Sequence, residues 1–108
     1  MLAENFFAQG GEIIRNEQIA VGVTSTIIAN VRLSTSPRKD ILVRNISTSV
    51  LDIITVNLGS QQAVLNTGII IQQGESFSFS SEASNPAPQC QFTAICATAN
   101  GLLSIMER

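Results

Sequence analysis

The chain consists of short runs rich in Ile, Val and Thr, each ended by Gly, Pro, Asn or Ser. β-Branched residues favour pleated strands, and the residues that end each run favour turns. No helix of useful length and no alternation of strands with helices is predicted after residue 17. The pattern therefore predicts an all-β fold, a single jelly-roll-like antiparallel β-sandwich, with a closed barrel as the alternative. The predicted strands are Ile19–Val23, Ser25–Leu33, Asp40–Ile46, Leu51–Leu58, Gly68–Ile71, Glu75–Ser80, Gln91–Ala97 and Leu102–Glu107.

Two local signals refine this prediction. The segment Glu75–Ser80 alternates strictly, so Phe77 and Phe79 share one face, and we expect both to lie in the core. The pair Asn100-Gly101 is typical of a tight hairpin turn between the last two strands.

Residues 1–17 differ from the rest and are predicted to form an extended N-terminal arm, which leaves residues 18–108 as the β-sandwich domain. The arm contains Phe6, Phe7, Ile13 and Ile14, four apolar side chains that are costly to leave in water. We expect these four residues to bind a partner, namely a neighbouring subunit. The alternatives are a short helix over residues 2–8 preceding the arm, or a frayed terminus.

Charge is scarce and apolar residues are frequent. Six Lys and Arg oppose eight Asp and Glu, for a formal net charge of −2, whereas 44% of the residues are hydrophobic. A chain of 108 residues holds one core and leaves much of its surface exposed. We therefore expect part of this apolar surface to be covered by other copies in a homo-oligomer.

The few basic residues do not indicate nucleic-acid binding. Arg32, Arg38, Lys39 and Arg44 form only a loose cluster, interpreted as solvated strand and turn residues, and no Trp or Tyr offers a stacking platform. No apolar run approaches the ~20 residues of a membrane helix, and the N-terminus lacks the basic region of a signal peptide. We therefore expect that the protein does not associate with a membrane. We also expect that it is made in a cytoplasm and is not exported.

The residue types that perform catalysis are missing or isolated. The chain has no His, so a Ser-His or Cys-His pair is excluded. Glu75 and Glu107 could be neighbours if their strands pair, but each lies at a strand end, where we expect a solvated carboxylate. Without His or a Cys-x-x-Cys motif, no metal site and no cofactor are predicted, and the chain is not expected to be an enzyme.

The two cysteines, Cys90 and Cys96, are expected to be buried free thiols. If residues 90–96 form one extended strand, the two Cα atoms lie roughly 20 Å apart. A disulfide requires a Cα separation below about 7 Å. The even spacing places both cysteines on one face of that strand together with Phe92 and Ala94.

The order of several segments resembles that of a known group of proteins. The segments are Pro37–Ser47, Asn57–Gly59, Gly68–Phe77, Phe92–Ala97 and Gly101–Arg108. In this order they resemble small β-sandwich accessory proteins in the virions of tailed bacteriophages, which include capsid decoration (cement) proteins. The resemblance covers residues 37–108 and carries no catalytic residues. The first 36 residues lie outside it, which leaves open whether the arm binds the capsid, a sister subunit or nothing.

The resemblance implies a structural virion protein on the outer surface of a phage capsid. Its partners would be the major capsid protein and further copies of itself, with a trimer as the expected form, and it would stabilise the shell non-covalently. It would be made in the host cytoplasm. Two alternatives remain: a module associated with the tail or a head fibre, or a β-sandwich that binds carbohydrate or a receptor.

Overall fold

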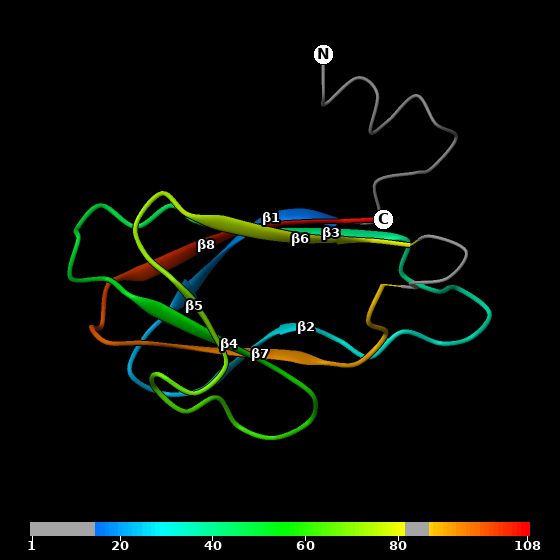
Figure 1. Ribbon diagram of the computed structural model, residues 1–108, viewed down its shortest axis with the longest axis horizontal. Helices are drawn as coiled ribbons and strands as arrows, with labels where there is room; N and C mark the ends of the chain where they lie inside the picture. Colours follow the sequence, from blue (N-terminus) through cyan, green and yellow to red (C-terminus); the bar gives the residue numbers. More distant parts are fainter. Residues whose placement is uncertain (1–14, 82–86) are drawn as a thin grey trace, which may run out of the picture.

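The computed structural model describes residues 15–81 and 87–108, and these form two antiparallel four-stranded sheets stacked face to face (Figure 1). The first sheet has the order β1 (Arg15–Val21), β8 (Gly101–Glu107), β3 (Asp40–Asn45) and β6 (Ser76–Ser80). The second sheet has the order β2 (Thr26–Ala29), β7 (Phe92–Cys96), β4 (Ile54–Leu58) and β5 (Ile69–Ile71). The predicted all-β sandwich is confirmed, and each of the eight predicted strands contains or overlaps an observed one.

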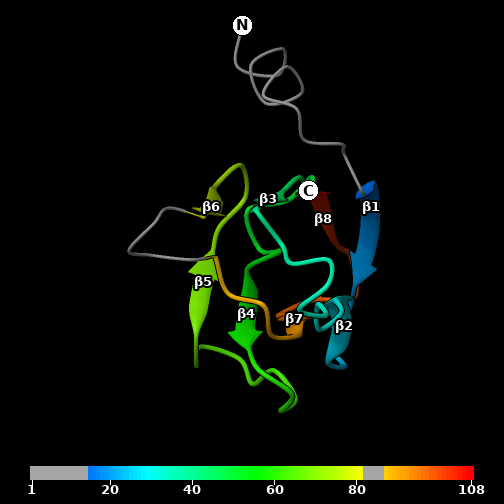
Figure 2. The ribbon, with the colours of Figure 1, turned by 90° about the vertical axis from the view of Figure 1, so that its right-hand side faces the viewer.

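The strands pair in a nested order. The first strand pairs with the last, β2 pairs with β7, β3 with β6 and β4 with β5. Two further pairings, between β3 and β8 and between β4 and β7, join these ribbons into the two sheets. Viewed from the end, β1 lies above β2 at one side of the sandwich and β6 above β5 at the other (Figure 2).

Alternation along the central strands directs one side-chain set into the space between the sheets. On β8 the residues at 101, 103, 105 and 107 are buried, while those between them are half-exposed. The fully buried core is apolar and comes from both sheets; its largest members are Phe92, Ile28, Ile41, Ile54, Leu103 and Ile105. Close packing of these branched side chains supplies most of the stabilisation of a fold of this kind.

The three aromatic rings of the core meet between the two sheets. The ring centroids of Phe77 and Phe79 on β6 lie 6.5 and 6.3 Å from that of Phe92 on β7. Both β6 rings are half-buried and pack against the core cluster, so their predicted inward orientation is confirmed. Aromatic pairs at these separations contribute about 0.5–1.5 kcal/mol each beyond their buried area.

Strand β1 begins at Arg15, before the predicted end of the arm at residue 17. Arg15 is paired with Glu107, and the register continues without a shift to Val21 opposite Gly101. Residues 15–17 therefore belong to the first sheet. The rest of the predicted arm, including Phe6, Phe7, Ile13 and Ile14, lies outside the described residues.

The connection between β4 and β5 covers part of the outer face of the second sheet. The Asn66 backbone N–H donates to the hydroxyl of Thr55, and the Thr93 hydroxyl donates to the Gln61 carbonyl. Both threonines are buried, although they lie on the outer face of the sheet and not between the two sheets. This loop places its exposed apolar side chains, Val64 and Leu65, on the same outer face as Ile27 and Ile70.

Candidate functional site

A carboxylate with three arginines around it lies at one end of the sandwich. The carboxylate of Glu107, the last residue of β8, accepts a hydrogen bond from Nε of Arg38 at 2.6 Å. A terminal nitrogen of Arg32 and Nε of Arg15 each lie 3.2 Å from a carboxylate oxygen of Glu107. The Glu107 side chain is 5% exposed and the Arg38 side chain 0%. These contacts tie the first strand, the last strand and the β2–β3 connection together at one point.

Arg38 uses its remaining donors on backbone carbonyls. Its terminal nitrogens donate to the carbonyl oxygens of Asn30 at 2.8 Å, Pro88 at 2.5 Å and Cys90 at 3.1 Å. Its guanidinium carbon lies 5.0 Å from the centroid of the Phe92 ring, within the range of a cation–π contact. The interpretation of Arg38 as a solvated turn residue was therefore wrong. A buried guanidinium is retained because its charge and its donors are both satisfied.

The two carboxylates that might have been neighbours are not. Strands β6 and β8 both pair with β3, on its opposite sides, so Glu75 and Glu107 do not approach each other. Glu75 is exposed and accepts the Gln72 backbone N–H at 2.7 Å, as expected for a solvated carboxylate. Glu107 is buried, so the expectation that it would be solvated was wrong.

A second polar cluster links the turns at the opposite end. The Asn45 side-chain amide donates to the carbonyls of Asp52 at 2.8 Å and Ile71 at 3.0 Å. The buried Asp52 carboxylate accepts the Thr98 hydroxyl at 2.5 Å, and its other oxygen has no hydrogen-bond partner among the described residues. These bonds hold the β3–β4 turn against the β7–β8 turn.

Neither cluster gathers a set of candidate metal ligands among the described residues. Among residues 15–81 and 87–108, no group of three or more His, Cys, Asp or Glu lies together in a way that could hold a metal ion. The two cysteines are free, with Cys96 buried as expected and Cys90 only half-buried. The prediction of a buried thiol is thus confirmed for Cys96 and wrong for Cys90.

The surface of the described part of the chain is unusual in carrying more large apolar side chains than charges. Nine large hydrophobic residues are exposed, by 40–73% of their area. Only four charged residues in the described ranges are classed as exposed: Glu17, Lys39, Arg44 and Glu75. Where such side chains adjoin one another, they form candidate surfaces for contact with other chains.

The exposed apolar side chains fall into three groups. Val23, Val50 and Leu51 lie in the turns at the end of the sandwich where Asp52 is buried, which we call the turn end. Ile27, Val64, Leu65 and Ile70 lie on the outer face of the second sheet. Val31 and Leu33 lie in the β2–β3 connection, beside Arg32. We take these three surfaces as the candidate functional sites.

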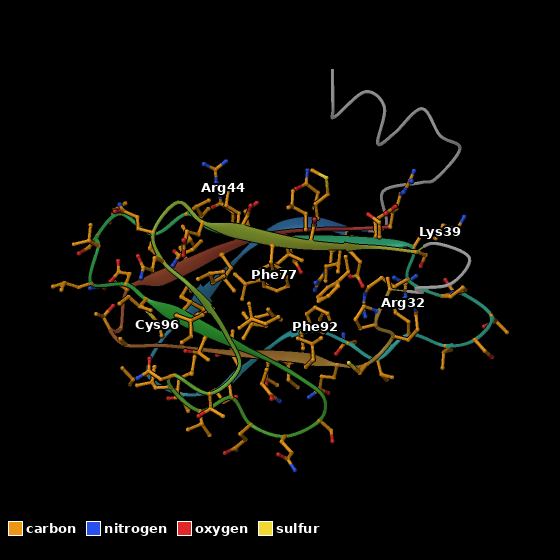
Figure 3. All side chains as sticks on the ribbon, in the orientation of Figure 1. Arg32, Lys39, Arg44, Phe77, Phe92 and Cys96 are labelled. Atoms are coloured by element: carbon orange, nitrogen blue, oxygen red, sulfur yellow. The ribbon has the colours of Figure 1, made fainter. Side chains whose placement is uncertain are left out.

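Five of the six basic residues of the chain gather at the end that holds Glu107, which we call the basic end: Arg15, Arg32, Arg38, Lys39 and Arg108. Figure 3 shows Arg32 and Lys39 at this end and Arg44 towards the opposite one. The sequence contained one signal for this cluster. Glu107 stands in phase with Leu103 and Ile105, so the alternation of β8 places it on the inner face.

Comparison of the chain with known protein families, curated proteins and solved structures finds no match. None of the described residues forms a helix long and apolar enough to cross a membrane.

Proposed function

We propose that this protein is a structural component of a phage virion, a decoration protein that binds the outer surface of the capsid and stabilises it non-covalently. The observation that carries this proposal is the surface, on which exposed large apolar residues outnumber exposed charged ones among the described residues. Such a surface is costly in water and is stabilised when other subunits cover it. The choice of a phage virion as the assembly rests on the order of sequence segments, which resembles that of phage accessory proteins.

The strand order supports the finer part of the fold assignment. The nested pairings β1·β8, β2·β7, β3·β6 and β4·β5 form when a long antiparallel ribbon of eight strands is rolled into two sheets. This is the arrangement of a jelly roll, a fold that recurs in viral capsid proteins. We propose a jelly roll with an N-terminal arm on residues 1–14, whose apolar side chains bind a neighbouring subunit in a trimer.

The turn end offers a contact surface for the major capsid protein. Val50 and Leu51 are exposed by 73% and 68%, and the carboxylate of the adjacent Asp52 is buried, so it does not interrupt their apolar surface. Burying two such side chains contributes about 1.5–3 kcal/mol each. Because a capsid presents the same surface many times, contacts of this size add up across an oligomer.

The test is co-sedimentation of the purified protein with capsids that lack it and, separately, with purified tails. We expect saturable binding to capsids in simple proportion to the capsid subunits, and weaker binding by the Val50→Ser, Leu51→Ser variant. Binding to tails alone would move the protein to another part of the virion. The absence of binding to either particle would overturn the proposal, and a glycan array would then test the carbohydrate-binding alternative.

A further inference from the structure

We infer that the basic end of one copy is the docking surface for residues 1–14 of a second copy. This inference deepens the proposed function and rests on its assignment of the arm as a partner-binding segment. It adds the place where the arm binds and the chemistry of the contact. Charge, apolar exposure and chain length each support it.

The charges of the two surfaces are complementary. Among the described residues at the basic end, five basic side chains stand against three acidic ones, Glu17, Asp40 and Glu107, an excess of two positive side-chain charges. Three guanidinium groups share the single carboxylate of Glu107, and the exposed Lys39 ammonium makes no ion pair within the described residues. The only charged side chains in residues 1–14 are Glu4 and Glu12. Opposite charges of this kind orient a contact and select its partner.

The apolar groups are complementary as well. Val31 and Leu33 are exposed by 63% and 70%, and they flank Arg32, which is held by Glu107 and Ser36. The segment 1–14 carries aromatic side chains at Phe6 and Phe7, between its two carboxylates. The inferred contact pairs the aromatic side chains of the segment with Val31 and Leu33, and its carboxylates with the basic residues around them.

Chain length permits the segment to reach a second copy. The segment joins the sandwich at Arg15, which itself belongs to the basic end. Fourteen extended residues span up to about 45 Å. This reach exceeds the longest dimension of the sandwich, 38 Å. Reciprocal exchange of segments would close a twofold dimer, whereas passing each segment to the next copy would close a ring such as a trimer.

The test uses two complementary variants of the full chain, analysed by sedimentation velocity. The donor-defective variant carries Phe6→Ser and Phe7→Ser, and the acceptor-defective variant carries Val31→Ser and Leu33→Ser. Each should weaken self-association by at least about tenfold, the effect of losing roughly 1.4 kcal/mol. The matched control, Val50→Ser with Leu51→Ser, changes equally exposed side chains at the turn end and should associate like the unchanged protein.

Mixing decides which copy receives the segment. Each defective variant retains the half that the other lacks, so an equimolar mixture should form a 1:1 complex. A mixture that stays monomeric would overturn the inference, because it would place the segment on its own copy or nowhere. A monomeric unchanged protein, or defective variants that still associate, would overturn it too. If the acceptor-defective variant does not fold, Lys39→Glu replaces it, with the same expected loss.

The outcome is separable from that of the proposed function. If the variants no longer associate but still bind capsids, the docking site is supported. If the donor-defective variant still associates but no longer binds capsids, the segment binds the capsid and the inference is refuted. Failure of the unchanged protein to bind capsids would refute the decoration role even where its copies associate. Raising NaCl from about 0.05 to 0.5 M should weaken the association between copies, because Lys39 is exposed and Arg15, Arg32 and Arg108 are partly exposed.

Discussion

Replacing Glu107 by Gln tests whether the arginine cluster needs its carboxylate. The amide keeps the shape of the side chain and can still accept from Arg38, but it removes the one negative charge shared by three guanidinium groups. Breaking a buried ion pair from one side typically costs about 3–5 kcal/mol. Because Arg38 keeps its three carbonyl acceptors, we expect the lower end, about 3 kcal/mol. Since a domain of this size is stable by about 5–15 kcal/mol, the variant should fold with a Tm lower by roughly 12 °C.

Urea denaturation followed by far-UV circular dichroism measures this change, because the chain has no Trp or Tyr to report by fluorescence. The control is Glu17→Gln, which removes a 47% exposed carboxylate from the same Arg15 and should cost less than about 1 kcal/mol. The midpoint should fall in the Glu107 variant with the slope unchanged. If both variants lost equally little stability, the argument that the buried cluster depends on charge would be refuted.

Three further predictions follow from the same packing. Gly101→Ala should lower the free energy of unfolding by about 1–3 kcal/mol, because an added Cβ would lie 2.5 Å from a β1 carbonyl oxygen and 2.8 Å from the Cys96 side chain. The control in the same denaturation assay is Gly22→Ala, whose added Cβ would meet nothing closer than 4.0 Å. A chromogenic disulfide reagent should titrate Cys90 in the native protein and Cys96 only after unfolding, and two equally fast thiols would contradict the burial of Cys96. Asn45→Ala should cost about 2–4 kcal/mol in thermal unfolding because it removes the side-chain donor to two carbonyls and the acceptor of the Ser47 N–H, and a loss below 1 kcal/mol would count against this role.

The strands were predictable because their signals are local. Alternation and turn residues reach only a few positions along the chain, and they indicated all eight strands and the inward faces of Phe77 and Phe79. The boundaries differ where tertiary pairing decides them. Segment 25–33 was predicted as one strand, but β2 spans only Thr26–Ala29 because the chain leaves the sheet after it, where Arg32 bonds to Glu107 and Gln89.

The buried charges were not predictable in the same way. Arg38 stands in the run Pro37-Arg38-Lys39-Asp40, which has the composition of a solvated turn. Its burial depends on Glu107, 69 residues later, and on the carbonyls of residues 88 and 90. No local pattern contains that information. The inward phase of Glu107 on β8 was present in the sequence, and a charge at an inward position requires a buried partner of opposite sign.

The placement of charge also bears on how the protein could assemble. A buried ion pair is seldom the most stabilising choice for a core, and its advantage is to fix one arrangement among several. Here Glu107 joins its own strand β8 to β1 and to the β2–β3 connection. Its ion pair with Arg15 holds the residue that directly follows the N-terminal segment. Five of the six basic residues lie at the basic end, whereas the turn end and the outer face of the second sheet carry few exposed charges. Contacts made there should depend little on salt, whereas those at the basic end should depend on it strongly. Salt dependence therefore separates contacts between copies from contacts with the capsid.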